Sequence, residues 1–164
     1  MRAPVPAISV REMHPGDEAA VGRLLAGLDP ESSYLRWFTG AVDLGVATDW
    51  AAHPDRVDAI GLLALAGDET VGHGVLIPCG DGRAEMAFEV AAPWRRHGVA
   101  GALLEHLLDA GERRGLREIF ADVLCENGDM LAVLRERGVH RETRDGGVVT
   151  ITFAVPPVRA GTER

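Results

Sequence analysis

The stretch PWRRHGVAGALLEHLL, residues 93–108, places two arginines and a histidine directly before a glycine and a leucine-rich segment. It follows a strand-like segment that ends near residue 90, and leucines on one side of it predict an amphipathic helix from Val99 to about Gly115. The first turn of a helix carries unpaired N–H donors and partial positive charge. Arg95 and Arg96 add permanently charged donors, and Gly98 lets an anion approach the backbone closely. The stretch therefore predicts a phosphate-like ligand at this helix start.

The glycine loop can be compared with three other kinds of loop. A plain strand-to-helix turn would have a similar sequence. A Rossmann dinucleotide fingerprint fits poorly, because its three-glycine spacing is missing and an antiparallel meander precedes the loop. A Walker loop is excluded, since the 164-residue chain contains no lysine.

Composition narrows the class of protein. The net charge of −8 makes nucleic acid an improbable partner and suits a cationic one. The two cysteines, Cys79 and Cys125, lie far apart without metal-ligand spacing, as in a reduced intracellular protein. Neither a secretory signal nor an apolar run of roughly 20 residues is evident, so no membrane partner and a cytoplasmic location are expected.

Hydrophobic periodicity and turn residues predict the element order β-α-α-β-β-β-α-β-α-β-β. This order indicates a mixed α/β fold, a mostly antiparallel sheet of about six or seven strands with about four helices on both faces. Asp17 is expected to cap the first helix, and residues 29–38 to form a second short one. A single domain is predicted over residues 10–155, between a flexible N-terminus (1–9) and a flexible tail (156–164).

The loop sequence R-R-H-G-V-A, residues 95–100, resembles the pyrophosphate-binding signature of the GNAT superfamily of acetyl-CoA-dependent N-acetyltransferases. Its flanks agree: AEMAFEV (84–90) is similar to the family's fourth strand, and IFADVLCENGDMLAVLRERGV (119–139) to the next strand, its Asn and a short helix. The resemblance runs from about residue 10 to 154. It implies that acetyl-CoA is the cosubstrate and that no metal is needed.

The resemblance also implies a set of site residues. Backbone groups of the loop would hold the pyrophosphate of coenzyme A, the strand before it would pair with the pantetheine arm, and Asn127 would contact that arm or cap a helix. The coenzyme-binding residues implied are Phe88, Glu89, Val90, Arg95, Arg96, His97, Gly98, Val99, Ala100, Gly101, Asn127 and Met130.

The chemistry requires a base, because an amine attacks a thioester only in its neutral form. Glu85 matches the glutamate that protein-modifying GNAT members use as general base, and Glu89, nominally on the same face, is the alternative. Without the resemblance, Glu85 could be an ordinary solvent-facing glutamate of a strand. The tyrosine that many members use as general acid is replaced by Leu134, which leaves water, Cys125 or His73 to protonate the thiolate.

The acceptor is indicated by LDPESSYLRWF, residues 28–38, which is similar to a segment of bacterial Pat-type protein lysine acetyltransferases. Those proteins modify AMP-forming acyl-CoA synthetases, so a protein lysine is the expected acceptor, framed by Glu31, Ser33, Tyr34 and Arg36. The same stretch could be a capped amphipathic turn. A small amine or antibiotic acetyltransferase and a non-catalytic acyl-CoA sensor remain open as alternatives, and the resemblance is compatible with a monomer or a homodimer.

Overall fold

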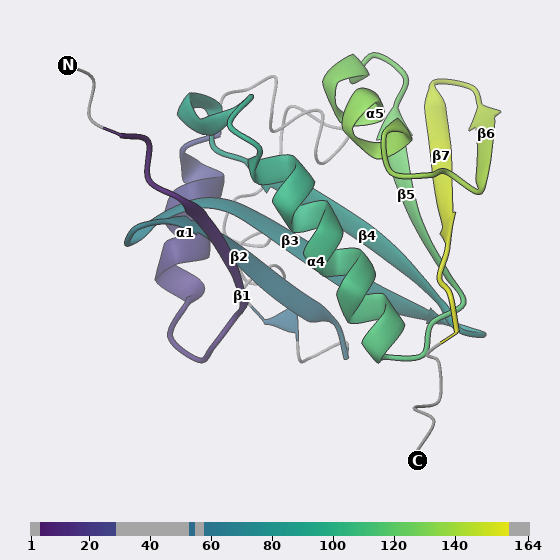
Figure 1. Ribbon diagram of the computed structural model, residues 1–164, viewed down its shortest axis with the longest axis horizontal. Coiled ribbons are helices and arrows are strands. Elements are labelled where there is room, and N and C mark those ends of the chain that lie inside the picture. Colours follow the sequence, from purple (N-terminus) through teal and green to yellow (C-terminus); the bar gives the residue numbers. More distant parts are fainter. Residues whose placement is uncertain (1–3, 29–52, 55–57, 158–164) are drawn as a thin grey trace.

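A computed structural model describes residues 4–28, 53–54 and 58–157 (Figure 1). These residues form one seven-stranded sheet in the order β1-β2-β3-β4-β5-β7-β6, in which only β4 and β5 pair in parallel. The strands are β1 (Ile8–Glu12), β2 (Ile60–Ala66), β3 (Glu69–Gly80), β4 (Arg83–Val90), β5 (Glu118–Leu124), β6 (Arg141–Asp145) and β7 (Val148–Ala154). The predicted mixed α/β class is therefore confirmed.

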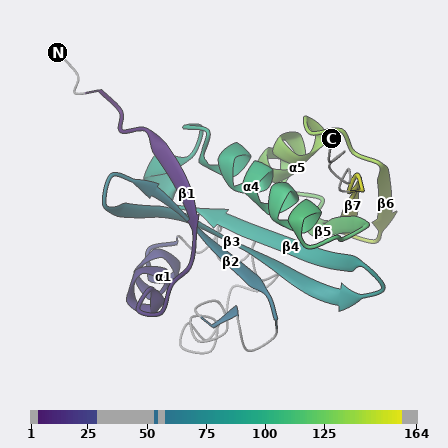
Figure 2. The ribbon, with the colours of Figure 1, turned by 60° about the horizontal axis from the view of Figure 1, so that its bottom comes forward.

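Helices cover both faces of the sheet. The helix α1 (Glu18–Ala26) packs on one face, and α4 (Val99–Arg113) and α5 (Gly128–Arg135) pack on the other (Figures 1 and 2). A 3-10 turn, η2 (Ala92–Trp94), joins β4 to the loop before α4. The described residues thus hold three α-helices, none long and apolar enough to cross a membrane.

The larger core lies between the sheet and α4. Leu103, Leu104 and Leu107 are fully buried there, as the helical spacing of the sequence predicts. On β4, the side chains of Met86 and Phe88 enter this core, while those of Glu85 and Glu89 alternate to the α1 face. The alternation gives the two faces of β4 different chemistry.

Two glycines of β3 allow α4 to approach the sheet closely. A Cβ on Gly72 would lie 2.9 Å from Cγ1 of Val99, and one on Gly74 would lie 3.3 Å from Cδ1 of Leu107. Larger residues would push the helix outward. The close approach fixes the start of α4 beside the end of β4.

The prediction for Asp17 was wrong in its detail. The residue precedes α1 as expected, but its carboxylate makes no hydrogen bond to the helix. It accepts instead from Arg11 at 2.8 and 3.0 Å and from the backbone N–H of His14 at 2.6 Å. The carboxylate therefore ties β1 to the connection before α1. The predicted short helix at residues 29–38 lies outside the described residues.

The Arg11–Asp17 pair predicts a pH-dependent stability. The hydrogen bond from Arg11 lowers the pKa of Asp17 from 3.8 to about 2. Because the folded-state pKa is depressed, the stabilisation is present above about pH 4 and is lost as the pH falls towards 2. We expect Asp17→Asn to lower the free energy of unfolding by about 1 kcal/mol at pH 7. Urea denaturation should show this difference vanishing between about pH 4 and 2.

The matched control is Asp109→Asn, at an exposed position of α4 with no ion pair among the described residues. The difference in the free energy of unfolding between Asp109→Asn and the wild type should stay constant over the same pH range. If the wild type became more stable relative to Asp17→Asn as the pH fell, the depressed pKa of Asp17 would be contradicted.

Candidate active site

The parallel strands β4 and β5 separate soon after they meet. Only Arg83–Glu85 pairs with Glu118–Phe120; beyond that point β4 continues for five residues without pairing to β5. In the part of the chain that the structure describes, the backbone of residues 86–90 therefore has one edge without a strand partner. An extended ligand could supply the missing hydrogen bonds.

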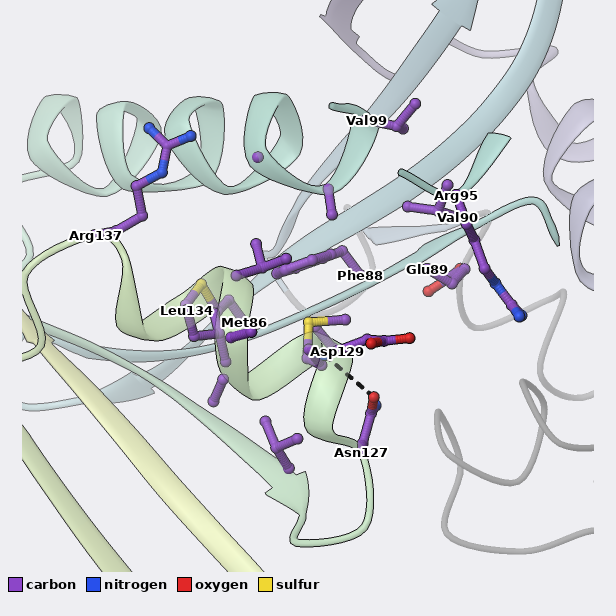
Figure 3. Close-up of a pocket in the computed structure, with 18 of the residues that line it drawn as sticks. Met86, Phe88, Glu89, Val90, Arg95, Val99, Asn127, Asp129, Leu134 and Arg137 are labelled. Carbon is purple, nitrogen blue, oxygen red and sulfur yellow. Dashed lines mark hydrogen bonds between the residues drawn. The ribbon is translucent and has the colours of Figure 1, made fainter. Parts of the chain in front are cut away.

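A cavity of about 840 Å³ fills this separation (Figure 3). Its walls come from β4, the loop and first turn of α4, β5 and α5, and they also include Leu28 after α1. Since α1 and α4 lie on opposite faces of the sheet, the described walls of the cavity include residues from both faces, with Leu28, Glu85, Ala87 and Glu89 on the α1 face. Two reactants could meet there from opposite sides.

The loop before α4 aims backbone donors at this cavity. Arg96 and Gly98 both adopt left-handed backbone conformations, with φ of 60° and 81°. The first bond of the helix runs from the N–H of Ala102 to the carbonyl of Gly98 at 3.1 Å. The N–H groups of Val99, Ala100 and Gly101 precede it, and all three residues line the cavity.

The structure brings the sequence-predicted coenzyme residues together. Every residue implied by the resemblance lines the cavity except His97. The exposed ring of His97 turns back on the loop, with Nδ1 2.7 Å from the carbonyl oxygen of Arg95 and an edge contact to Trp94. Its neighbours Arg95, Arg96 and Gly98 line the cavity, whereas the side chain of His97 is exposed outside it. A role for the backbone of His97 in holding the coenzyme stays a prediction.

Asn127 performs the capping role that its sequence position predicts. Its side-chain Oδ1 accepts from the backbone N–H of Met130 at 3.2 Å, which starts α5 (Figure 3). Both residues line the cavity, so the cap also fixes part of its wall. Leu134, in the position of the family's tyrosine, lines the cavity as well and is fully buried.

The two predicted carboxylates differ in their surroundings. Glu85 is partly exposed in the cavity wall at the last paired position of β4 and β5. Glu89 is only 6% exposed, and its Oε1 lies 2.7 Å from Nδ1 of His73. Neither His73 nor Cys125 lines the cavity, so no described position supports either of them as the proton donor to the thiolate.

Several residues that line the cavity belong to no motif that the sequence analysis identifies. Trp94, Asp129 and Arg137 belong to the cavity, and Arg137 also pairs with Glu105 of α4. The only signal for them was their position beside the predicted loop and the short helix. Glu31, Ser33, Tyr34 and Arg36 lie outside the described residues. Among those that are described, no group of three His, Cys, Asp or Glu side chains could hold a metal ion.

This arrangement suits an acyltransferase of the kind that uses coenzyme A thioesters: a helix start with backbone donors, a strand edge without a strand partner among the described residues, and a carboxylate meet in one cavity. The sequence model of the Acetyltransferase (GNAT) family matches residues 26–139. The chain belongs to this family and is an acetyl-CoA-dependent N-acetyltransferase.

Solved structures agree with the family. The GNAT domain of S. lividans Pat is 30% identical, with a TM-score of 0.79 over 88% of this chain and 89% of that one. The yncA protein of Salmonella typhimurium, solved with its cofactor acetyl-CoA, is 16% identical, with a TM-score of 0.74 over 94% and 97%. Spermidine N-acetyltransferase from Vibrio cholerae, in complex with CoA and spermine, is 17% identical, with a TM-score of 0.70 over 90% and 95%. Among curated protein sequences, none matches the chain.

The described residues fit coenzyme A. The donors of the first turn of α4, with Arg95 and Arg96, suit a pyrophosphate, and the edge of β4 that has no strand partner among the described residues suits the amides of a pantetheine arm. Bound there, acetyl-CoA supplies an activated acyl group. The chain's own part is to hold and orient it.

A glycine substitution tests the loop. Alanine at Gly98 would be strained by about 1–2 kcal/mol at its φ of 81° and would turn the N–H groups of the first turn of α4. We expect Gly98→Ala to raise the KM for acetyl-CoA about tenfold and to change kcat less. Steady-state kinetics with varied acetyl-CoA measure both.

Gly115→Ala is the matched control. Gly115 has a φ of 71° just after α4 and, like Gly98, no atom within 4 Å of a built Cβ. Both variants should lose similar stability in urea, but only Gly98→Ala should lose affinity for acetyl-CoA. Equal KM values in the two variants would show that this loop does not hold the coenzyme.

Proposed function

We propose that this protein transfers the acetyl group of acetyl-CoA to the ε-amine of a lysine on another protein, with an AMP-forming acyl-CoA synthetase as the first candidate. The observation that carries the proposal is the 30% identity to the GNAT domain of S. lividans Pat over nearly the whole of both chains. The Pat-like segment at residues 28–38 and the net charge of −8, which suits a lysine-bearing surface, support it.

Glu85 is the general base in this proposal. It lies in the cavity wall where β4 and β5 begin to separate, on the α1 face of the sheet and opposite to the core of α4. A lysine ammonium has a pKa of about 10.4, so nearly all of it must lose a proton before it can attack. A carboxylate at this point can accept that proton directly or through one water.

The transfer is a direct displacement. The neutral amine attacks the thioester carbonyl, a C–N bond forms, the C–S bond breaks, and Glu85 takes the proton that the amine loses. The buried side chain of Leu134 has no proton to give, so in this proposal water protonates the departing thiolate. Holding both reactants in one cavity replaces any need for a covalent enzyme intermediate.

The experiment is the intact mass of a purified AMP-forming acetyl-CoA synthetase after incubation with this protein and acetyl-CoA. We expect one added acetyl group with the wild type. Glu85→Gln should slow the addition at least about 100-fold, because general-base catalysis contributes that much, while acetyl-CoA binding persists. The rate is measured from the mass spectrum at successive times.

Glu69→Gln is the matched control, since Glu69 is an exposed residue at the start of β3, away from the cavity. It should act at the wild-type rate. An unmodified synthetase would refute this acceptor, and thiol release with small primary amines would then identify a small-molecule enzyme. A synthetase acetylated equally fast by Glu85→Gln would remove Glu85 as the base.

A further inference from the structure

A fully buried histidine supports one wall of the active site from behind. His73 of β3 stands directly opposite Glu89 of β4 in the antiparallel register, and its Nδ1 lies 2.7 Å from Oε1 of Glu89. The exposed fractions are 0% for His73 and 6% for Glu89. On its other side His73 stands opposite Leu63 of β2, which packs against α1, so the pair lies on the α1 face.

Only one member of this pair reaches the cavity. Glu89 lines it near Val90 and Arg95 (Figure 3), whereas His73 is not part of its wall. A carboxylate accepts hydrogen bonds, so Nδ1 of His73 is the donor in either charge state of the ring. The bond fixes one oxygen of Glu89 and, through it, the direction of the carboxylate.

Stability alone gives no reason for this pair. A buried carboxylate and a buried imidazole both lose hydration, and apolar residues of similar volume often serve a core as well or better. The other ring nitrogen, Nε2, is buried without a hydrogen-bond partner among the described residues, which costs further free energy. Such a pair is expected where a site requires the charge.

The neighbours of Glu89 on β4 show what the charge faces. Glu85, Ala87 and Glu89 alternate onto the same face, and all three line the cavity. Glu85 and Glu89 are four residues apart, so their Cα atoms lie about 13 Å apart along the strand, with the small side chain of Ala87 midway at about 6.6 Å from each. A cation that enters over Ala87 from the α1 face lies between them.

We propose that Glu89, oriented by His73, binds the ammonium form of the acceptor beside Glu85, and that His73 is a positioning residue for acceptor binding. This rests on the proposed amine acceptor but not on its being a protein. Glu85 then removes the proton from an amine that Glu89 has already captured. The assignment gives the two carboxylates different tasks: one binds, and the other acts as base.

The kinetic test separates these tasks. His73→Leu removes the donor, and His73→Asn returns an amide N–H close to the place of Nδ1. We expect His73→Leu and Glu89→Gln each to raise the acceptor KM about tenfold, with kcat within about twofold of wild type. The KM for acetyl-CoA should also stay within about twofold, because the expected contact of Glu89 with the coenzyme is through its backbone, which Glu89→Gln leaves in place. His73→Asn should recover most of the acceptor affinity. Thr152→Val, at another buried polar residue, should leave the acceptor KM unchanged.

A second measurement needs no turnover. The Nδ1–H of a fully buried ring exchanges slowly with water, so we expect a downfield proton resonance that His73→Leu abolishes. Butylammonium, which copies the end of a lysine side chain, should shift this resonance as it approaches Glu89. If no synthetase is acetylated, butylamine can replace it as the acceptor in the kinetic test. The roles of His73 and Glu89 can then be tested even if the proposed protein acceptor is wrong.

Three results would overturn the proposal. The first is a wild-type acceptor KM in His73→Leu. The second is a resonance that stays in place when butylammonium competes with the acceptor. A loss of kcat in Glu89→Gln at an unchanged acceptor KM would likewise refute it, because Glu89 would then be acting in the chemical step and not in binding.

Discussion

The separation of β4 from β5 is the constraint on which the site depends. Pairing stops at Glu85 and Phe120, and the cavity occupies the space that the diverging strands leave. The glycines of β3 hold α4 close to the sheet, so the start of that helix stays beside the end of β4. An open strand edge and an anion-binding helix start are thereby brought into one cavity. Neither of these two features by itself would bind a long, two-part ligand such as coenzyme A.

The same strand gives the site two chemically different sides. Alternation along β4 sends Met86 and Phe88 into the core under α4 and leaves Glu85, Ala87 and Glu89 on the α1 face. Backbone donors therefore collect at the start of α4, where an anionic coenzyme fits, and two carboxylate side chains lie on the opposite face of β4. In the reaction that we propose, each side of the strand would match the charge of one reactant.

Some predictions that depend only on neighbouring residues in the sequence are confirmed. The loop and α4 follow from a glycine-arginine stretch that opens a leucine-rich helix, and the Asn127 cap follows from one asparagine before a helical pattern. A prediction that depended on side-chain direction was wrong. The carboxylate of Asp17 faces Arg11 instead of its own helix. A sequence pattern places a residue on an element but does not choose among its nearby partners.

Sequence patterns were sufficient to predict the strands and helices that the structure describes, the glycine loop before α4 and the family, because periodicity, caps and a short motif are properties of neighbouring residues. The separation of β4 and β5 after Glu85 and the position of His73 behind Glu89 depend on the tertiary structure and follow from no sequence pattern. His73 and Glu89 are 16 residues apart, and only the antiparallel register of β3 and β4 puts one opposite the other. Strand register is fixed by the packing of a whole face against its core, so no single stretch of the chain records it.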